Sequence, residues 1–162
     1  MRSTRPIVAG LLLAIVLSAA LLLAACGSSS GSSGSSGGVR VQAPADFSVA
    51  KYAGKPLVVN FFGSWCGPCN SEAPDLATFS KANPAVQFVG IAVNDTESAA
   101  TSFMSNYGLA YPVVVDDNSL SARYGITGVP TTIFFDSGGR EVDRIRGAAS
   151  LDQFGQSLAK AQ

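Results

Sequence analysis

The 162-residue sequence contains no histidine, only three cysteines and a single tryptophan. Without an imidazole, the chain excludes Ser-His-Asp and Cys-His nucleophiles, histidine-ligated metals and a histidine base that titrates near neutral pH. An excess of basic charge is also absent, because 11 Lys and Arg balance 11 Asp and Glu. We therefore expect no nucleic-acid partner. Three cysteines are also too few for a disulfide scaffold.

Residues 1–25 have the layout of a signal peptide. Arg2 and Arg5 precede an uncharged run of 19 residues, from Ile7 to Ala25. The run ends in Leu23-Ala24-Ala25-Cys26, which resembles the bacterial lipobox, where the cysteine receives a lipid and becomes the mature N-terminus. We therefore expect a lipoprotein signal peptide and lipidation of Cys26. The alternative is an uncleaved anchor helix, because the run is also long enough to span a bilayer.

The segment after Cys26 contains only glycine and serine up to residue 38. It has no apolar side chain to bury, so residues 26–38 are predicted to be a lipidated cysteine and a flexible tether. Arg2 and Arg5 favour a cytoplasmic N-terminus, which places the rest of the chain outside the cytoplasm. We therefore expect a domain held by lipid at the extracytoplasmic face of the cell membrane, with protein substrates close to that surface.

Residues 39–162 have the length of one domain, and their pattern predicts an α/β fold. Leu57–Phe62 and Val86–Val93 are predicted to be buried strands, because β-branched and aromatic residues follow one another with little alternation. Residues 70–83 between them have helical spacing, and Pro74 is expected to kink that helix. This order of strand, helix and strand predicts a right-handed parallel crossover.

The remaining segments complete a mixed sheet. Further helical segments are predicted at 98–107, 119–124 and 150–161, and further strands at 111–115, 131–135 and 141–146. The last two strands are joined by Asp136-Ser137-Gly138-Gly139-Arg140, which is a hairpin turn signal. A parallel βαβ unit followed by an antiparallel ββα unit implies a mixed central sheet with helices on both faces.

Cys66 and Cys69 form a Cys-x-x-Cys motif directly after the first predicted strand, where the helix opens. Unpaired N–H groups and the macrodipole at a helix N-terminus lower the pKa of a thiol such as Cys66. The spacing also lets Cys69 come within bonding distance of Cys66. The alternatives are a structural disulfide or half of a zinc site, but a zinc site needs further ligands, and only Cys26 is left. We expect no metal and no cofactor.

The motif Trp65-Cys66-Gly67-Pro68-Cys69, together with Val58–Pro74, Gly128–Thr132 and Gly147, resembles the thioredoxin-fold oxidoreductases. Within these, Asn60–Pro74 is similar to the membrane-tethered TlpA/ResA group, and Ser98–Val115 resembles the extra helix and strand of that group. The resemblance implies a thioredoxin fold with this addition. It also implies a redox-active Cys66–Cys69 disulfide, in which Cys66 attacks and Cys69 resolves.

The same resemblance gives supporting roles to neighbouring residues. Trp65 would shield the sulfur and offer a docking surface, the alternative being an ordinary core position. Pro130, after Val129, would form the cis-proline loop that lies opposite the cysteines and pairs with a substrate peptide, unless it is only a proline at the start of a strand. Gly67 and Pro68, between the cysteines, are thioredoxin-like.

Glu72 matches a glutamate that ResA-like members place near the cysteines. It would take the proton from Cys69 when this thiol attacks a mixed disulfide, with partial burial raising its pKa. The alternative is a solvated glutamate on the helix surface. Thioredoxin has a buried aspartate where this chain has Asn60, so Glu72 is the only acid close by in sequence.

In function, the resemblance implies a protein disulfide reductase, which in this group often prepares haem-binding cysteines for c-type cytochrome assembly. Electrons would come from a membrane donor such as a CcdA-like protein. Gly67-Pro68 and the absence of a histidine between the cysteines favour a reductase over a thiol oxidase or isomerase of the same fold. A third reading is a non-catalytic thioredoxin-fold module that holds a partner at the Pro130 edge.

Overall fold

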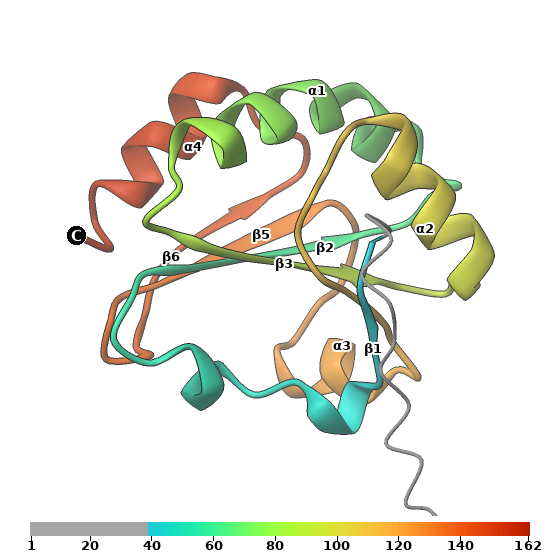
Figure 1. The fold of residues 1–162 in the computed structure, drawn as a ribbon, viewed down its shortest axis with the longest axis horizontal. Helices are drawn as coiled ribbons and strands as arrows, with labels where there is room; N and C mark the ends of the chain where they lie inside the picture. The colour runs from blue at the N-terminus through green and yellow to red at the C-terminus, as the bar shows by residue number, and fades with distance from the viewer. Residues whose placement is uncertain (1–38) are drawn as a thin grey trace, which may run out of the picture. The chain divides into compact units, whose positions relative to one another are not determined.

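The computed structural model describes residues 39–162 (Figure 1). The predicted signal peptide, Cys26 and the tether lie outside the described residues. The strands in the described part are β1 (Val41–Gln42), β2 (Leu57–Phe62), β3 (Gln87–Ala92), β4 (Val113–Val115), β5 (Thr131–Phe135) and β6 (Glu141–Arg146). The α-helices are α1 (Gly67–Ala82), α2 (Glu97–Asn106), α3 (Ser119–Arg123) and α4 (Leu151–Leu158), and the 3-10 helices are η1 (Pro44–Asp46) and η2 (Val49–Tyr52).

The six strands form one mixed sheet with the order β1-β4-β3-β2-β5-β6. β2, β3, β4 and β1 pair in parallel, whereas β5 is antiparallel to both β2 and β6. The predicted mixed sheet and the parallel crossover through α1 are therefore confirmed. β2 lies between a parallel and an antiparallel neighbour, so the strand that leads to the cysteines is near the centre of the sheet.

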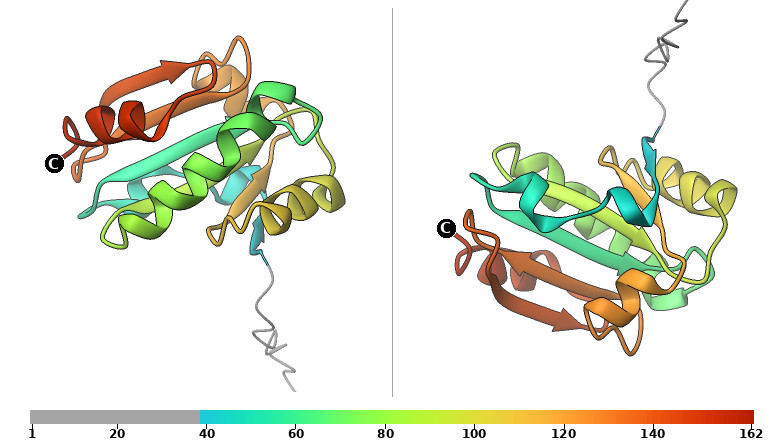
Figure 2. Two further views of the ribbon diagram at one scale, coloured as in Figure 1. Left: turned by 90° about the horizontal axis from the view of Figure 1, so that it is seen from above. Right: turned by 90° about the horizontal axis from the view of Figure 1, so that it is seen from below.

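Helices cover both faces of the sheet, as predicted. α1 and α4 lie over one face, and α3 with the two 3-10 helices lies over the other (Figure 1 and Figure 2). Phe79 of α1 stacks on Phe154 of α4 with ring centroids 5.4 Å apart, while Leu120 of α3 belongs to the cluster on the opposite face. Alternate side chains of β2 enter the two clusters, Phe61 on one face and Phe62 on the other.

The extra helix and strand implied by the resemblance are present as α2 and β4. α2 packs on the same face as α1, since Phe103 stacks on Phe62 with ring centroids 4.7 Å apart. Within residues 39–162, no helix combines the length and the apolar character that a membrane crossing requires.

The structure places the start of α1 earlier than the sequence predicts. α1 begins at Gly67 rather than at residue 70, because Pro68 is tolerated in the first turn, where its missing N–H has no helical partner to lose. α1 also continues through Pro74 to Ala82. β1, η1 and η2 are not expected from the sequence, because segments of two to four residues are too short to show a period.

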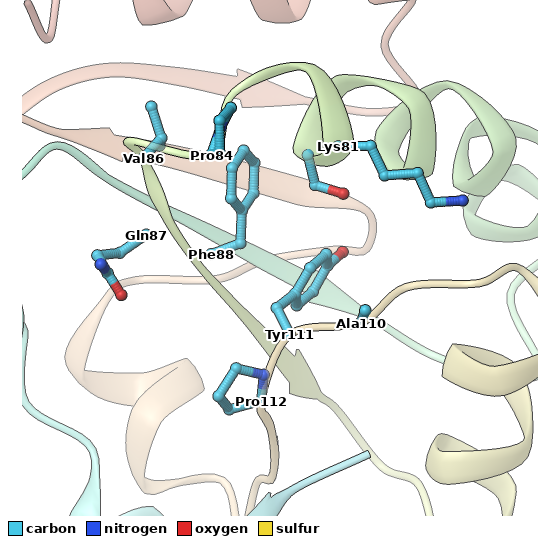
Figure 3. Close-up of a pocket in the computed structure, with 9 residues that line it drawn as sticks. Lys81, Pro84, Val86, Gln87, Phe88, Ala110, Tyr111 and Pro112 are labelled. Atoms are coloured by element: carbon cyan, nitrogen blue, oxygen red, sulfur yellow. The ribbon is translucent and has the colours of Figure 1, made fainter. Parts of the chain in front are cut away.

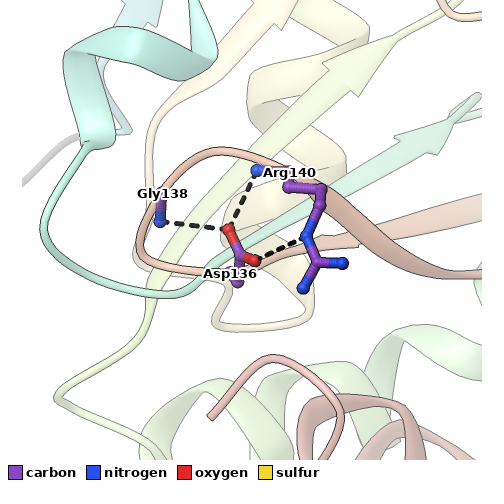
Figure 4. Close-up of polar contacts among 3 residues, drawn as sticks. All are labelled: Asp136, Gly138 and Arg140. Carbon is purple, nitrogen blue, oxygen red and sulfur yellow. Dashed lines mark hydrogen bonds and ion pairs between the residues drawn. The ribbon is translucent and has the colours of Figure 1, made fainter.

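Asp136 organises the predicted hairpin between β5 and β6 (Figure 4). Its Oδ1 accepts hydrogen bonds from the backbone N–H groups of Arg140 (2.9 Å) and Gly138 (3.0 Å), and its Oδ2 accepts from Nε of Arg140 (3.1 Å). The Arg140 backbone bond in particular holds the pKa of Asp136 below its ordinary value. Gly139 adopts a φ of 80°, a conformation that only glycine takes readily.

β6 forms one edge of the sheet and carries paired charges. Arg144 bonds Glu141 (2.8 Å), and Asp143 bonds Lys160, which follows α4 (2.8 Å). The opposite edge is β1, which is only two residues long.

Candidate functional site

The chain leaves β2 at Phe62 and turns sharply to reach Cys66. The N–H of Cys66 donates to the carbonyl oxygen of Gly63 (3.0 Å). A Cβ on Gly63 would come within 2.6 Å of the ring of Trp65. Glycine at this position therefore lets the indole fold back over the turn.

Cys66 and Cys69 form a disulfide across the first turn of α1, with their Cα atoms 5.2 Å apart. Cys66 is the N-cap of the helix, and its Sγ accepts a hydrogen bond from the backbone N–H of Cys69 (3.2 Å). Both cysteines are buried in this state. The N–H of Cys69, in the first turn of α1, is thus directed at the sulfur of Cys66, an arrangement that stabilises a thiolate.

The loop before β5 lies against the disulfide. The Val129–Pro130 peptide bond is cis, and the carbonyl oxygen of Val129 lies 3.7 Å from Sγ of Cys66. The carbonyl oxygen of Pro130 accepts a hydrogen bond from the N–H of Gly147 (2.9 Å), which follows β6. Pro130 therefore occupies the position opposite the cysteines that the resemblance implies.

Trp65 projects into solvent next to the disulfide. Its side chain is 60% exposed, which contradicts the alternative of a core position. The indole Nε1 donates to the carbonyl oxygens of Val93 (3.2 Å) and Asn94 (3.1 Å), at the end of β3. A cavity of about 300 Å³ beside the indole has uncharged walls, formed by Trp65, Val93, Asn94, Asn118, Ser121, Ile126, Thr127, Gly128 and Val129.

Glu72 lies on the inner side of α1 and is only 4% exposed, so the alternative of a solvated glutamate is wrong. Its Oε1 accepts a hydrogen bond from Nδ2 of Asn60 (3.0 Å), and its Oε2 accepts from the N–H of Ala149 (3.0 Å). Burial raises the pKa of Glu72 to about 7, although both hydrogen bonds act in the opposite direction. Glu72 is therefore a buried acid that changes charge near neutral pH.

Asn60 connects this acid to the sheet. Its Nδ2 donates both to Glu72 and to Oγ1 of Thr132 (2.9 Å), which lies opposite Asn60 in the β2–β5 pair. Where thioredoxin has an aspartate, this chain thus has an amide that donates to the glutamate. The contact joins β2, β5 and α1.

Three further residues hold the turn before Cys66, and their role is not expected from the sequence. Asp95 accepts hydrogen bonds from the N–H (2.6 Å) and Oγ (2.9 Å) of Ser64. Nδ2 of Asn70 donates to the carbonyl oxygens of Ser64 (3.1 Å) and Cys66 (2.8 Å), and the hydroxyl of Tyr107 donates to Oδ1 of Asn70 (2.9 Å). No motif links these positions, so only the folded chain brings them together.

A second cavity, of about 380 Å³, lies at the other end of α1 (Figure 3). The rings of Phe88 and Tyr111 stack there with centroids 5.7 Å apart. Lys81 is fifteen residues along the chain from Cys66, so this cavity is roughly 20 Å from the disulfide along the helix. Among residues 39–162, no group of three acidic or cysteine side chains is placed to hold a metal ion.

Residues 38–158 match the model of the Redoxin family. The chain belongs to this family. This Redoxin family member is 38% identical over 118 residues to the soluble secreted antigen MPT53 of Mycobacterium tuberculosis, a match that covers 71% of this chain and 68% of MPT53. It is 34% identical over 97 residues to the thiol-disulfide oxidoreductase ResA of Bacillus subtilis, covering 58% of this chain and 54% of ResA.

Solved structures agree with the family and the fold. One is a secreted Mycobacterium tuberculosis disulfide oxidoreductase homologous to E. coli DsbE, which has a TM-score of 0.64 and 36% identity over 70% of this chain and 87% of that chain. Another is Mycobacterium tuberculosis DsbF, with a TM-score of 0.65 and 32% identity over 69% and 84% of the two chains. This Redoxin family member is therefore a thiol-disulfide oxidoreductase with a thioredoxin fold, similar to the TlpA/ResA group.

Proposed function

We propose that this oxidoreductase reduces disulfides in protein substrates at the extracytoplasmic face of the cell membrane, through Cys66 and Cys69. The observation that carries the proposal is the Cys66–Cys69 disulfide at the N-terminus of α1, against the Val129 carbonyl oxygen. A helix N-terminus favours the thiolate form of Cys66, and the facing backbone can receive a peptide. Gly67 and Pro68 between the cysteines are as in thioredoxin, which is a reductant.

The reaction begins with the reduced protein. The Cys66 thiolate attacks one sulfur of the substrate disulfide, forming a mixed disulfide and releasing one substrate thiolate. Cys69 loses its proton, and its thiolate attacks Sγ of Cys66, which closes the protein disulfide and releases the second substrate thiolate. Both substrate thiolates take up protons. The substrate gains two electrons, and the protein needs a dithiol donor to return to the reduced state.

Glu72 is proposed to accept the proton of Cys69. Its carboxylate is buried beneath the first turns of α1, and its pKa of about 7 matches proton transfer at neutral pH. Asn60 and Ala149 donate to its two oxygens, so the carboxylate is held in one orientation while it changes charge.

Substrate binding is assigned to the surface between Trp65 and the Val129–Pro130 loop. A peptide added in extended form beside Val129 would place its cysteine next to Cys66, with neighbouring side chains in the cavity beside Trp65. The walls of this cavity carry no charge, so recognition relies on hydrogen bonds and apolar contact and not on ion pairs. This suits an enzyme that acts on more than one unfolded substrate.

The extracytoplasmic location is supported by the predicted signal peptide and by the relative MPT53, which is a soluble secreted antigen. We propose that Cys26 is lipidated and that a CcdA-like membrane protein supplies electrons. Apocytochromes c are the proposed substrates, by analogy with the group. Radioactive palmitate should label the wild-type protein and not the Cys26→Ala variant, and label that persists in the variant would remove the lipid anchor from the proposal.

The reduction potential of the Cys66–Cys69 pair tests the direction of electron flow. We expect a value near that of thioredoxin, about −270 mV, and a value near that of DsbA, about −120 mV, would favour a thiol oxidase instead. Cys69→Ser should accumulate mixed disulfides with substrate proteins, because resolution is blocked, and Cys66→Ser should form none. If Cys66→Ser retains function in cells, the protein is a binding module and not a reductase.

A further inference from the structure

The turn that carries Cys66 is held by the segment inserted between β3 and β4. On one side, Asp95 accepts two hydrogen bonds from Ser64, and the end of β3 accepts the indole N–H of Trp65. Asp95 stands directly before the N-cap of α2. The beginning of the inserted helix is therefore tied to the turn.

On the other side, the end of α2 reaches the same turn through Asn70. The carbonyl oxygen of Cys66 accepts both the helical N–H of Asn70 (3.1 Å) and its side-chain Nδ2 (2.8 Å), and the carbonyl oxygen of Ser64 accepts from Nδ2 as well (3.1 Å). Tyr107, the C-cap of α2, donates its hydroxyl to Oδ1 of Asn70 (2.9 Å). This bond fixes which end of the amide faces the two carbonyl groups.

We infer that Asn70, oriented by Tyr107, is a positioning residue that aims the N-terminus of α1 at the sulfur of Cys66. The N–H of Cys69 reaches Sγ of Cys66 only while Cys66 keeps its N-cap geometry, and Asn70 bonds the carbonyl group of Cys66 itself. The inference rests on the proposed roles of Cys66 and Cys69, but not on the direction of electron flow.

The surroundings of Asn70 make this role separable from charge effects. A cavity of about 300 Å³ beside it is lined only by uncharged residues, which are Ser64, Asn70, Ala99, Ser102, Phe103, Asn106 and Tyr107. Removing the amide or the hydroxyl therefore removes hydrogen bonds and leaves the local charge unchanged.

Loss of the Asn70 hydrogen bonds should change the equilibrium between the dithiol and disulfide forms of Cys66 and Cys69. The disulfide is held by a covalent bond even when the turn loosens, whereas the Cys66 thiolate depends on the N–H of Cys69 and on the dipole of α1. A loosened turn thus destabilises the thiolate more than the disulfide, and the protein becomes a stronger reductant. The loss of such hydrogen bonds should change the redox equilibrium constant about threefold to tenfold, and tenfold corresponds to about 30 mV.

The test is the redox equilibrium of the full chain with glutathione, measured for Asn70→Ala, Tyr107→Phe and the double variant. We expect Asn70→Ala to shift the equilibrium about threefold to tenfold toward the disulfide, and Tyr107→Phe to shift it less in the same direction. The double variant should match Asn70→Ala alone, because Tyr107 acts through Asn70. Tyr52→Phe, on the opposite face of the sheet, serves as control and should leave the equilibrium unchanged.

Several results would overturn the inference. One is an unchanged equilibrium constant for Asn70→Ala, even if this variant is less stable, because the residue would then have only a structural role. Another is a double variant whose shift is the sum of the single shifts. A wild-type protein that exchanges no thiols with glutathione would contradict the proposed function itself, whereas normal exchange with unshifted variants would contradict the positioning role alone.

Discussion

The carboxyl group of Glu72 is buried on the inner side of α1, close to the cysteines in sequence. Burial raises its pKa, whereas the N–H groups of Ala149 and Asn60 lower it by stabilising the ionised form. The balance between these effects places its pKa at about 7. In a protein without histidine, we propose that this carboxyl group takes the acid–base role that an imidazole has elsewhere.

Replacing Glu72 with Gln should slow thiol exchange at neutral pH. Cys69 would lose its proton acceptor, and general acid–base groups typically contribute about 100-fold or more to a rate. We expect single-turnover reduction of a model disulfide to slow by at least about tenfold in the resolving step, with water replacing the carboxylate in part. Glu97→Gln, on the exposed start of α2, is the control, and equal rates for all three proteins would refute the role of Glu72.

The same carboxyl group should make stability depend on pH. Its pKa rises from 4.5 to about 7 on folding, so between these values the folded protein holds one proton more than the unfolded chain. Stability from this group is therefore complete below pH 4.5 and is lost as the pH rises to about 7, at about 1.4 kcal/mol per pH unit and roughly 3 kcal/mol in total.

Urea unfolding of the oxidised protein between pH 4.5 and 8 measures this slope. The slope should be absent from Glu72→Gln, whatever the absolute stability of that variant. Asp136 and Asp143 do not interfere, because their pKa values lie below the ordinary one. A wild-type slope that equals that of the variant would show that Glu72 does not titrate in this range.

At the scale of elements, each predicted strand and helix is present, although β4 and α4 are shorter than predicted. Leu57–Phe62 is an uninterrupted apolar run apart from Asn60 and is buried at every position, and α2 and β4 match the segment identified by resemblance to within one residue. The sequence could not show that β1 joins β4, since a strand of two residues has no period.

The residues of the candidate site also divide into those that the sequence predicts and those that only the folded chain brings together. Cys66, Cys69 and Pro130 stand in motifs, and Glu72 is expected because it matches a glutamate of ResA-like proteins. Asn70, Asp95 and Tyr107 were missed, because their partners are set by how α2 returns to the turn before α1. Contacts between distant segments follow from packing and leave no local pattern.

Ser150 should stabilise α4 through a capping box. Its Oγ accepts from the N–H of Gln153 (3.4 Å), and Oε1 of Gln153 accepts from the N–H of Ser150 (2.9 Å). Ser150→Ala should lower the free energy of unfolding by about 1 kcal/mol, measured with urea. Gln156→Ala, exposed on the same helix, should change it by less than about 0.5 kcal/mol. Equal effects of the two substitutions would contradict the cap.

At the scale of the whole molecule, one sheet joins two apolar clusters. β2, β3 and β5 contribute side chains to both clusters, so neither cluster can unfold unless the sheet also unfolds. We therefore expect residues 39–162 to unfold in one cooperative transition, seen at the same urea concentration by circular dichroism and by the fluorescence of Trp65.

Phe154 tests this coupling. Phe154 is fully buried and stacks on Phe79, so Phe154→Ala should lower the free energy of unfolding by about 3–5 kcal/mol. The urea midpoints seen by circular dichroism and by fluorescence should fall together. Leu151→Ala, on the exposed side of α4, should cost less than about 1 kcal/mol. Separate transitions in Phe154→Ala would mean that the two faces unfold independently.

The charges along β6, at one edge of the sheet, oppose self-association. An open edge strand exposes backbone groups that a second copy could extend, which is a common start of aggregation. Along β6, Glu141, Asp143 and Arg144 would have to leave water before another strand could pair, and at the other edge β1 is too short to template one. At high protein concentration, two copies should therefore not pair through their edge strands. The backbone beside Val129 then stays available for a partner that carries a cysteine.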